Sequence, residues 1–202
     1  MPNLQEKMTV QDVKDVPRKV VALVYDGLCT FEYGIVAEIF GLKRPEIGQE
    51  LYSFASFAPE QGKIRLAGGL TASADGTQED FIQADIVVIP GWRGKDIPVP
   101  EHICALVRSA HRRGARLLSI CSGVYVLAAA GLLDGRQATT HWRYACDLQE
   151  KYPAIEVLPD SLYVDHGDVI TSAGSSAGID ASLHIVRTDY GSQIANSVAR
   201  RL

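Results

Sequence analysis

RLLSICSGVYVLAAAG, residues 116–131, passes from an apolar run through a short polar break into an alanine-rich run that ends at a glycine. The first part predicts a buried strand and the last part a helix, so Cys121 stands where strand becomes helix. Ser119 and Gly123 flank Cys121 at the spacing of a nucleophile elbow, a turn so sharp that large side chains do not fit beside the reactive atom. Ser119 replaces the first glycine of the usual hydrolase form.

This position predicts a reactive thiol at Cys121. Free backbone N–H groups and the positive end of a helix dipole stabilise a thiolate, which lowers the pKa of the thiol. The alternative is a small buried cysteine of the core, which is common in proteins. The local pattern leaves both interpretations open.

Strand-like and helix-like segments alternate along the rest of the chain. Strands are predicted at 19–25, 51–58, 64–66, 85–90, 116–119 and 138–140, with a hairpin formed by 162–164 and 169–172. Helices are predicted at 30–40, 100–113, 123–130, 142–151 and 178–190. This alternation predicts an α/β fold with a mostly parallel sheet covered on both faces, and with its active groups at the carboxyl ends of the strands.

Composition limits the class of protein. A chain of 202 residues, 47% hydrophobic and 22% charged, is long enough for one substantial core, so we expect a single domain over 18–202 after a loose tail at 1–17. The net charge is −4, and no stripe of basic residues suggests that this chain itself binds DNA.

Four scattered cysteines form no CxxC pair, and no apolar run is long enough for a signal peptide or a membrane span. We therefore expect a cytoplasmic protein that does not contact a membrane and has no structural zinc site. The glycines at 68–69 and 91–94 do not have the spacing of a phosphate-binding loop, so we expect no cofactor.

Glu32 is a second candidate site residue. In the predicted helix 30–40, Phe31, Ile35 and Ile39 belong to one apolar stripe, and Glu32 falls near its middle. A buried carboxylate is costly unless it is paired or protonated. We interpret Glu32 as a group that shares a proton with a nearby thiolate or acts as a general acid or base. The alternative is a first-turn glutamate that favours the helix N-terminus and reaches solvent.

His141 is the third candidate. It follows a short predicted strand and precedes a predicted helix, where a side chain can face a crevice at the edge of the sheet. The other four histidines fall on predicted helices or in a turn. A single histidine is more often structural than catalytic, and His141 is the one that we assign to the site.

Four motifs together resemble the ThiJ/PfpI superfamily. They are ICSG at 120–123, LAAAGLLDG at 127–135, ATTHW at 138–142 and GSSAGID at 174–180. The resemblance covers about residues 18–190. Within the superfamily the chain is most similar to the sensor-like N-terminal domains of AraC-type (GlxA-like) transcriptional regulators, and isocyanide hydratases are close relatives.

The resemblance implies a flavodoxin-like three-layer sandwich, similar to class I glutamine amidotransferases, that forms a homodimer. It makes Cys121 the elbow cysteine and Glu32 the neighbouring acid, and it aligns His141 with the family's Thr-Thr-His-Trp motif. Isocyanide hydratases carry Asp where Glu32 stands, which weakens a transfer of their activity. Peptidase-like members carry His where Ser122 stands, so a proteolytic Cys–His pair is not expected.

Two functions remain open. The preferred one is an effector- or redox-sensing domain of an AraC-type regulator, in which Cys121 and Glu32 line a small-molecule pocket with Gly91 and Trp92 at its rim. In this hypothesis DNA is contacted only through a helix-turn-helix domain that this chain lacks. The sequence ends at Leu202 with no such segment, as expected for the sensing half of a regulator.

The alternative is a cofactor-independent hydratase or hydrolase. Its Cys121 thiolate would attack an electrophilic carbon, and Glu32 would deliver or accept the proton. Backbone N–H groups near Ser122 and Gly123 would hold the developing negative charge.

Overall fold

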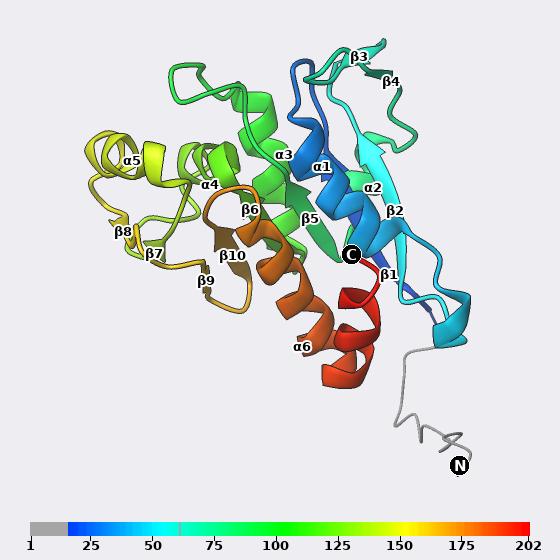
Figure 1. Ribbon diagram of the computed structural model, residues 1–202. Helices are drawn as coiled ribbons and strands as arrows, with labels where there is room; N and C mark the ends of the chain where they lie inside the picture. The colour runs from blue at the N-terminus through cyan, green and yellow to red at the C-terminus, as the bar shows by residue number, and fades with distance from the viewer. Residues whose placement is uncertain (1–15, 61) are drawn as a thin grey trace.

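A six-stranded sheet with the strand order β2-β1-β5-β6-β10-β9 forms the centre of the computed structural model, which describes residues 16–60 and 62–202 (Figure 1). Its strands are β1 (Arg18–Leu23), β2 (Tyr52–Phe57), β5 (Ile86–Ile89), β6 (Arg116–Ile120), β9 (Tyr163–Asp165) and β10 (Val169–Ser172). All neighbouring strands are parallel except β9, which runs antiparallel to β10. The predicted mostly parallel sheet is confirmed.

Helices cover both faces of this sheet. On one face α1 (Thr30–Val36), a π-helical turn (Ala37–Gly41) and α6 (Ala177–Ala199) pack together, and on the other lie α2 (Gln78–Ile82), α3 (Glu101–Arg112) and α4 (Val124–Ala129) (Figure 1). Every residue of β5 is buried, as expected for a strand covered on both faces. The arrangement is the expected flavodoxin-like three-layer α/β sandwich.

The remaining elements are short. Two small sheets pair β3 (Ile64–Arg65) with β4 (Thr71–Ala72) and β7 (Gln137–Ala138) with β8 (Glu156–Val157). The other helical segments are α5 (Ala145–Lys151) and three 3₁₀ turns, at Pro45–Ile47, Cys121–Gly123 and Trp142–Tyr144. No helix within 16–60 or 62–202 has the length and apolar character needed to cross a bilayer.

The structure corrects several predicted boundaries. The sequence analysis missed α2, because its five residues are too few to show a helical period. This helix begins with a capping box formed by Thr77 and Asp80. The last helix continues past its predicted end at 190, but Gly191 breaks its geometry with φ 83° and ψ 170°. Most of the predicted tail 1–17 lies outside the described residues.

Candidate functional site

The carboxyl ends of four parallel strands meet at one edge of the sheet. Tyr25 follows β1, Gly91 follows β5, Cys121 follows β6 and Ala173 follows β10. The chain leaves β1 toward β2 on one side and later returns to β5 on the other side, so the strand order reverses between β1 and β5. In open α/β sheets the crevice at such a reversal is the usual place for a ligand.

Cys121 occupies the turn between β6 and α4 with an unusual backbone. Its φ of 55° is the one positive value at a non-glycine residue in the described part of the chain. The Cys121 N–H donates a hydrogen bond to the Ala173 carbonyl at 3.0 Å, and its own carbonyl accepts one from Thr140 Oγ1 at 2.8 Å. Two neighbouring segments therefore hold this backbone in a conformation that costs free energy.

Close backbone packing explains two glycines beside Cys121. A Cβ on Gly123 would lie 2.3 Å from the Ile89 carbonyl oxygen, so any other residue there would force β5 and the β6 turn apart. Gly91 has a φ of +125°, and a Cβ on it would lie 3.1 Å from the Tyr25 hydroxyl. Both glycines allow the ends of three strands to meet.

The Ser122 hydroxyl joins two loops of the site. Its Oγ accepts a hydrogen bond from the Trp92 N–H at 2.9 Å and donates one to the Trp92 carbonyl at 3.0 Å. These contacts bind the β6 turn to the loop after β5. The Ser122 side chain is thus occupied in positioning, which leaves its backbone N–H to face the thiol of Cys121.

Glu32 is buried in the first turn of α1, with 4% of its surface exposed. Ser175 Oγ donates a hydrogen bond to its Oε1 at 2.5 Å. The other oxygen, Oε2, is buried and has no hydrogen-bond partner among the described residues. The predicted burial of Glu32 is confirmed, and the alternative of a solvent-facing first-turn residue is wrong.

The thiol of Cys121 does not have the lowered pKa that its position predicted. Burial raises the pKa of Cys121 to about 11, and the charge of the neighbouring Glu32 adds to the rise. The Ser122 backbone N–H lowers the pKa but does not offset those two effects. At neutral pH the sulfur of Cys121 therefore holds its proton.

Tyr25 and Cys29 belong to the same cluster, and the sequence analysis missed both. Burial raises the pKa of Tyr25, and the charges of Glu32 and Cys121 raise it further. Cys29 stands at the N-cap of α1, where its surface is exposed overall. Partial burial of its thiol is the largest cause that raises its pKa, and contact with Glu32 is the next. The spacing from N-cap to N3 puts Cys29 and Glu32 side by side, a signal that was present in the sequence.

His141 lies behind the turn that holds Cys121. Its Nδ1 accepts a hydrogen bond from the Arg143 N–H at 3.2 Å, and its ring centroid is 5.5 Å from that of Trp142. A Cβ on Gly174 would lie 2.8 Å from His141 Cδ2, so the ring also packs on the loop after β10. The structure brings Cys121 and Glu32 together but gives His141 no hydrogen bond to either in the described residues.

Trp92, expected at the rim of the site, is only 6% exposed and forms part of its wall. Its ring centroid is 5.1 Å from that of Tyr25, and its Nε1 donates a hydrogen bond to the Ile97 carbonyl at 3.0 Å. The side chain of the next residue, Arg93, is partly exposed.

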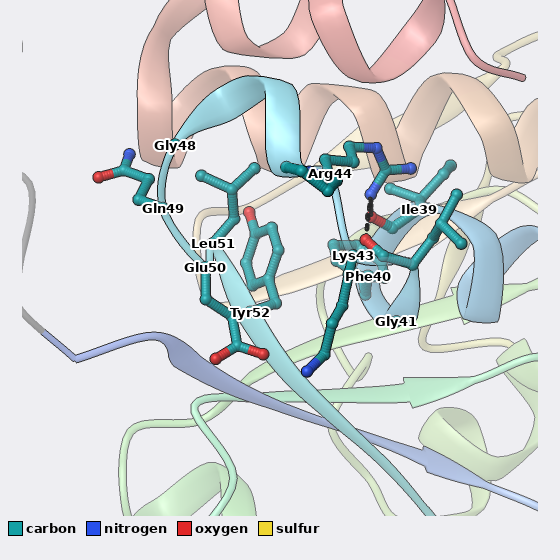
Figure 2. Close-up of a pocket in the computed structure, with 12 residues that line it drawn as sticks. Ile39, Phe40, Gly41, Lys43, Arg44, Gly48, Gln49, Glu50, Leu51 and Tyr52 are labelled. Carbon is teal, nitrogen blue, oxygen red and sulfur yellow. Dashed lines mark hydrogen bonds between the residues drawn. The ribbon is translucent and has the colours of Figure 1, made fainter.

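A cavity of about 410 Å³ lies elsewhere, between the end of α1 and the start of β2 (Figure 2). Residues 39–45 and 48–52 line it, and among them Arg44 donates hydrogen bonds to the carbonyls of Ile39 and Leu42 at 3.0 Å. None of the predicted site residues borders this cavity. Across 16–60 and 62–202 no three His, Cys, Asp or Glu side chains gather as a metal site.

Comparison with known proteins identifies the family. Residues 18–188 match the DJ-1/PfpI family. The chain belongs to this family. DJ-1/PfpI is the family that the sequence motifs resembled under the name ThiJ/PfpI.

Relatives of this DJ-1/PfpI chain include regulators and an enzyme. It is 33% identical over 153 residues to the HTH-type transcriptional regulator CdhR of Pseudomonas aeruginosa, covering 75% of this chain and 45% of that protein. It is 32% identical over 136 residues to an isonitrile hydratase of Pseudomonas putida, covering 66% of this chain and 58% of the hydratase. The chain thus spans about half the length of the regulators that it matches.

A crystal structure of an AraC family transcriptional regulator from Pseudomonas putida has the same fold. Its TM-score is 0.79 at 18% identity, and the match covers 91% of this chain and 98% of that one. At this identity the likeness concerns the fold alone.

Proposed function

We propose that this chain is the effector- or redox-sensing domain of an AraC-type transcriptional regulator. In this proposal it works as a homodimer in the cytoplasm and acts on DNA only through a separate domain of the full protein. Its similarity to such regulators over about half of their length supports the assignment.

The observation that carries the proposal is the pair of partly buried Cys121 and buried Glu32 at the carboxyl ends of the strands. Among the described residues Glu32 Oε2 is a buried acceptor without a hydrogen-bond partner, beside a thiol that keeps its proton. A buried acceptor without a hydrogen bond destabilises the folded protein, and a ligand or a proton that bonds to it removes this destabilisation. Cys121 and Glu32 therefore form the reactive part of the site.

A redox signal is chemically possible at this pair. As Cys121 Sγ attacks a peroxide, Glu32 takes the thiol proton and passes it to the departing oxygen. The sulfur gains one oxygen as a sulfenic acid, the O–O bond is broken, and water or an alcohol leaves. Because the proton leaves the sulfur as the S–O bond forms, the raised pKa of Cys121 does not block the reaction. The Ser122 and Gly123 N–H groups would stabilise the developing charge.

An apolar groove supplies a face for the homodimer. It lies along α1 and α6 and is lined in part by Phe31, Ile35 and Ile179. Phe31 is 54% exposed although it is a large aromatic residue. Burying such a patch against a second copy removes it from water, which favours association.

A stand-alone hydratase is the second candidate, and the similarity to isonitrile hydratase over two thirds of this chain favours it. In that reaction Cys121 would attack the terminal carbon of the isonitrile, and Glu32 would transfer the proton.

One experiment separates the two candidates. Protein is incubated with a small alkyl isonitrile, and in parallel with one equivalent of hydrogen peroxide, and a Cys121→Ser variant serves as the control. The sensing proposal predicts one modification of Cys121 by peroxide, a shifted melting temperature and no turnover. Repeated turnover of the isonitrile that is lost in the variant would instead establish the hydratase.

A further inference from the structure

The guanidinium of Arg93 lies over two aromatic side chains beside the site. Its guanidinium carbon is 5.5 Å from the ring centroid of Tyr25 and 5.4 Å from that of Trp92. Both rings are buried, and they contact each other. A cation–π contact of this kind holds the guanidinium without using its N–H donors.

The guanidinium N–H donors of Arg93 bind one acidic side chain, that of Glu60. Arg93 Nη2 donates hydrogen bonds to both carboxylate oxygens of Glu60, in the segment after β2. The Glu60 side chain is 50% exposed and that of Arg93 26%. An ion pair so open to water contributes little to stability, so another carboxylate can replace Glu60 at small cost.

Two links connect Arg93 to the thiol. Arg93 follows Trp92, whose backbone is bonded on both sides to the Ser122 hydroxyl next to Cys121. Its charge also acts on Tyr25 and lowers the pKa of that residue, which the charges of Glu32 and Cys121 raise. Tyr25 thus contacts the guanidinium and also feels the charges of the reactive pair.

We propose that Arg93 is a specificity-determining residue of the Cys121 site and selects small ligands that carry a carboxylate. The inference rests on the proposed function, since it names the chemical class that the sensing site accepts. The two rings keep the guanidinium in place when the Glu60 carboxylate is displaced. Two N–H groups of the guanidinium can then donate parallel hydrogen bonds to the carboxylate of a ligand. Negative charge on Glu32 repels an anion, so the carboxylate of the ligand binds at Arg93 and the rest of the ligand extends toward Cys121.

Two alkylating reagents of nearly equal size test this proposal. Iodoacetate carries a carboxylate and iodoacetamide does not, and with each the sulfur displaces iodide to form the same thioether linkage. Mass spectrometry of the Cys121 peptide gives both rates, and their ratio measures the preference for the anion. Exposed Cys146 on α5, which is not among the groups that act on the Cys121 thiol, gives the same ratio outside the reactive pair and is the internal control.

The ratio at Cys121 is expected to fall roughly threefold in Arg93→Gln, the effect of one charge several ångströms away in a wet site. It should rise in Glu60→Gln, because the guanidinium loses its competing partner, and it should not change at Cys146 in either variant. General changes in access cancel in the ratio, and the Glu60 variant keeps Arg93 and its packing.

An unchanged ratio in Arg93→Gln, or a lower ratio in Glu60→Gln, would overturn the assignment of Arg93 while leaving the sensing site intact. If Cys121 reacts with neither reagent in the unmodified protein, the site is closed to small molecules, and the proposed function fails together with this inference.

Discussion

Replacing Glu32 by Gln should lower the pKa of Cys121. The pKa of this thiol is raised from 9.0 to about 11, which corresponds to about 2.7 kcal/mol between its two protonation states. Burial is the largest cause and Glu32 the next. The variant removes the charge but keeps the shape of the side chain, so burial continues to act on the sulfur.

Each unit by which the pKa of Cys121 falls in the variant corresponds to roughly 1.4 kcal/mol and to a tenfold larger thiolate fraction at any pH below the pKa. The assay is the ultraviolet absorbance of the thiolate against pH, taken as the difference between each protein and its Cys121→Ser counterpart. That difference removes the signals of the other cysteines and the tyrosines.

Glu38→Gln is the matched control, because Glu38 lies one to two turns further along the same helical segment and does not contribute to the pKa of Cys121. A Cys121 pKa that stays the same or rises in Glu32→Gln would refute the electrostatic reasoning. A fall of equal size in Glu38→Gln would show that the effect is not local.

Three further predictions concern stability and assembly. Because the folded pKa of Cys121 exceeds the unfolded one, its contribution to stability is full below pH 9 and is lost as the pH rises through 11. From below pH 9 to above pH 11, the free energy of unfolding in urea should therefore fall by roughly 2.7 kcal/mol more in the wild type than in Cys121→Ser; equal losses would contradict it. Gly123→Ala should destabilise the fold by about 3 kcal/mol and lower the melting temperature by roughly 6–12 °C, since its Cβ would overlap the Ile89 carbonyl; an unchanged melting curve would be evidence against that overlap. Phe31→Asp should turn the homodimer into a monomer in sedimentation, whereas Leu162→Asp, at a residue 60% exposed outside the groove, should not; a dimer that survives the Phe31 change would exclude this face.

The sequence was sufficient for the architecture because the central strands are long apolar runs that alternate with helical periods. The burial of Glu32 followed from the same periodicity, since a helical wheel places residue 32 among apolar neighbours. Short elements such as α2 could not be predicted in this way, because capping and tertiary contacts define them and they are too short to show a hydrophobic period.

The electrostatics of the site could not be predicted from the local pattern. The helix-terminus argument accounts for the Ser122 N–H at the thiol but not for Glu32, which approaches from 89 positions away through tertiary packing. Arg93 and Tyr25 were missed for the same reason, because their importance arises from the meeting of two strand ends.

Oxidation of Cys121 by hydrogen peroxide at neutral pH tests most directly whether Glu32 accepts the thiol proton. The rate is followed by mass spectrometry of the Cys121 peptide in the wild type and in Glu32→Gln. Loss of the base predicts oxidation about 10²-fold slower in the variant, even though its thiolate fraction is larger. A variant that oxidises as fast as the wild type or faster would mean that thiolate fraction alone controls Cys121 and that Glu32 is not its proton acceptor.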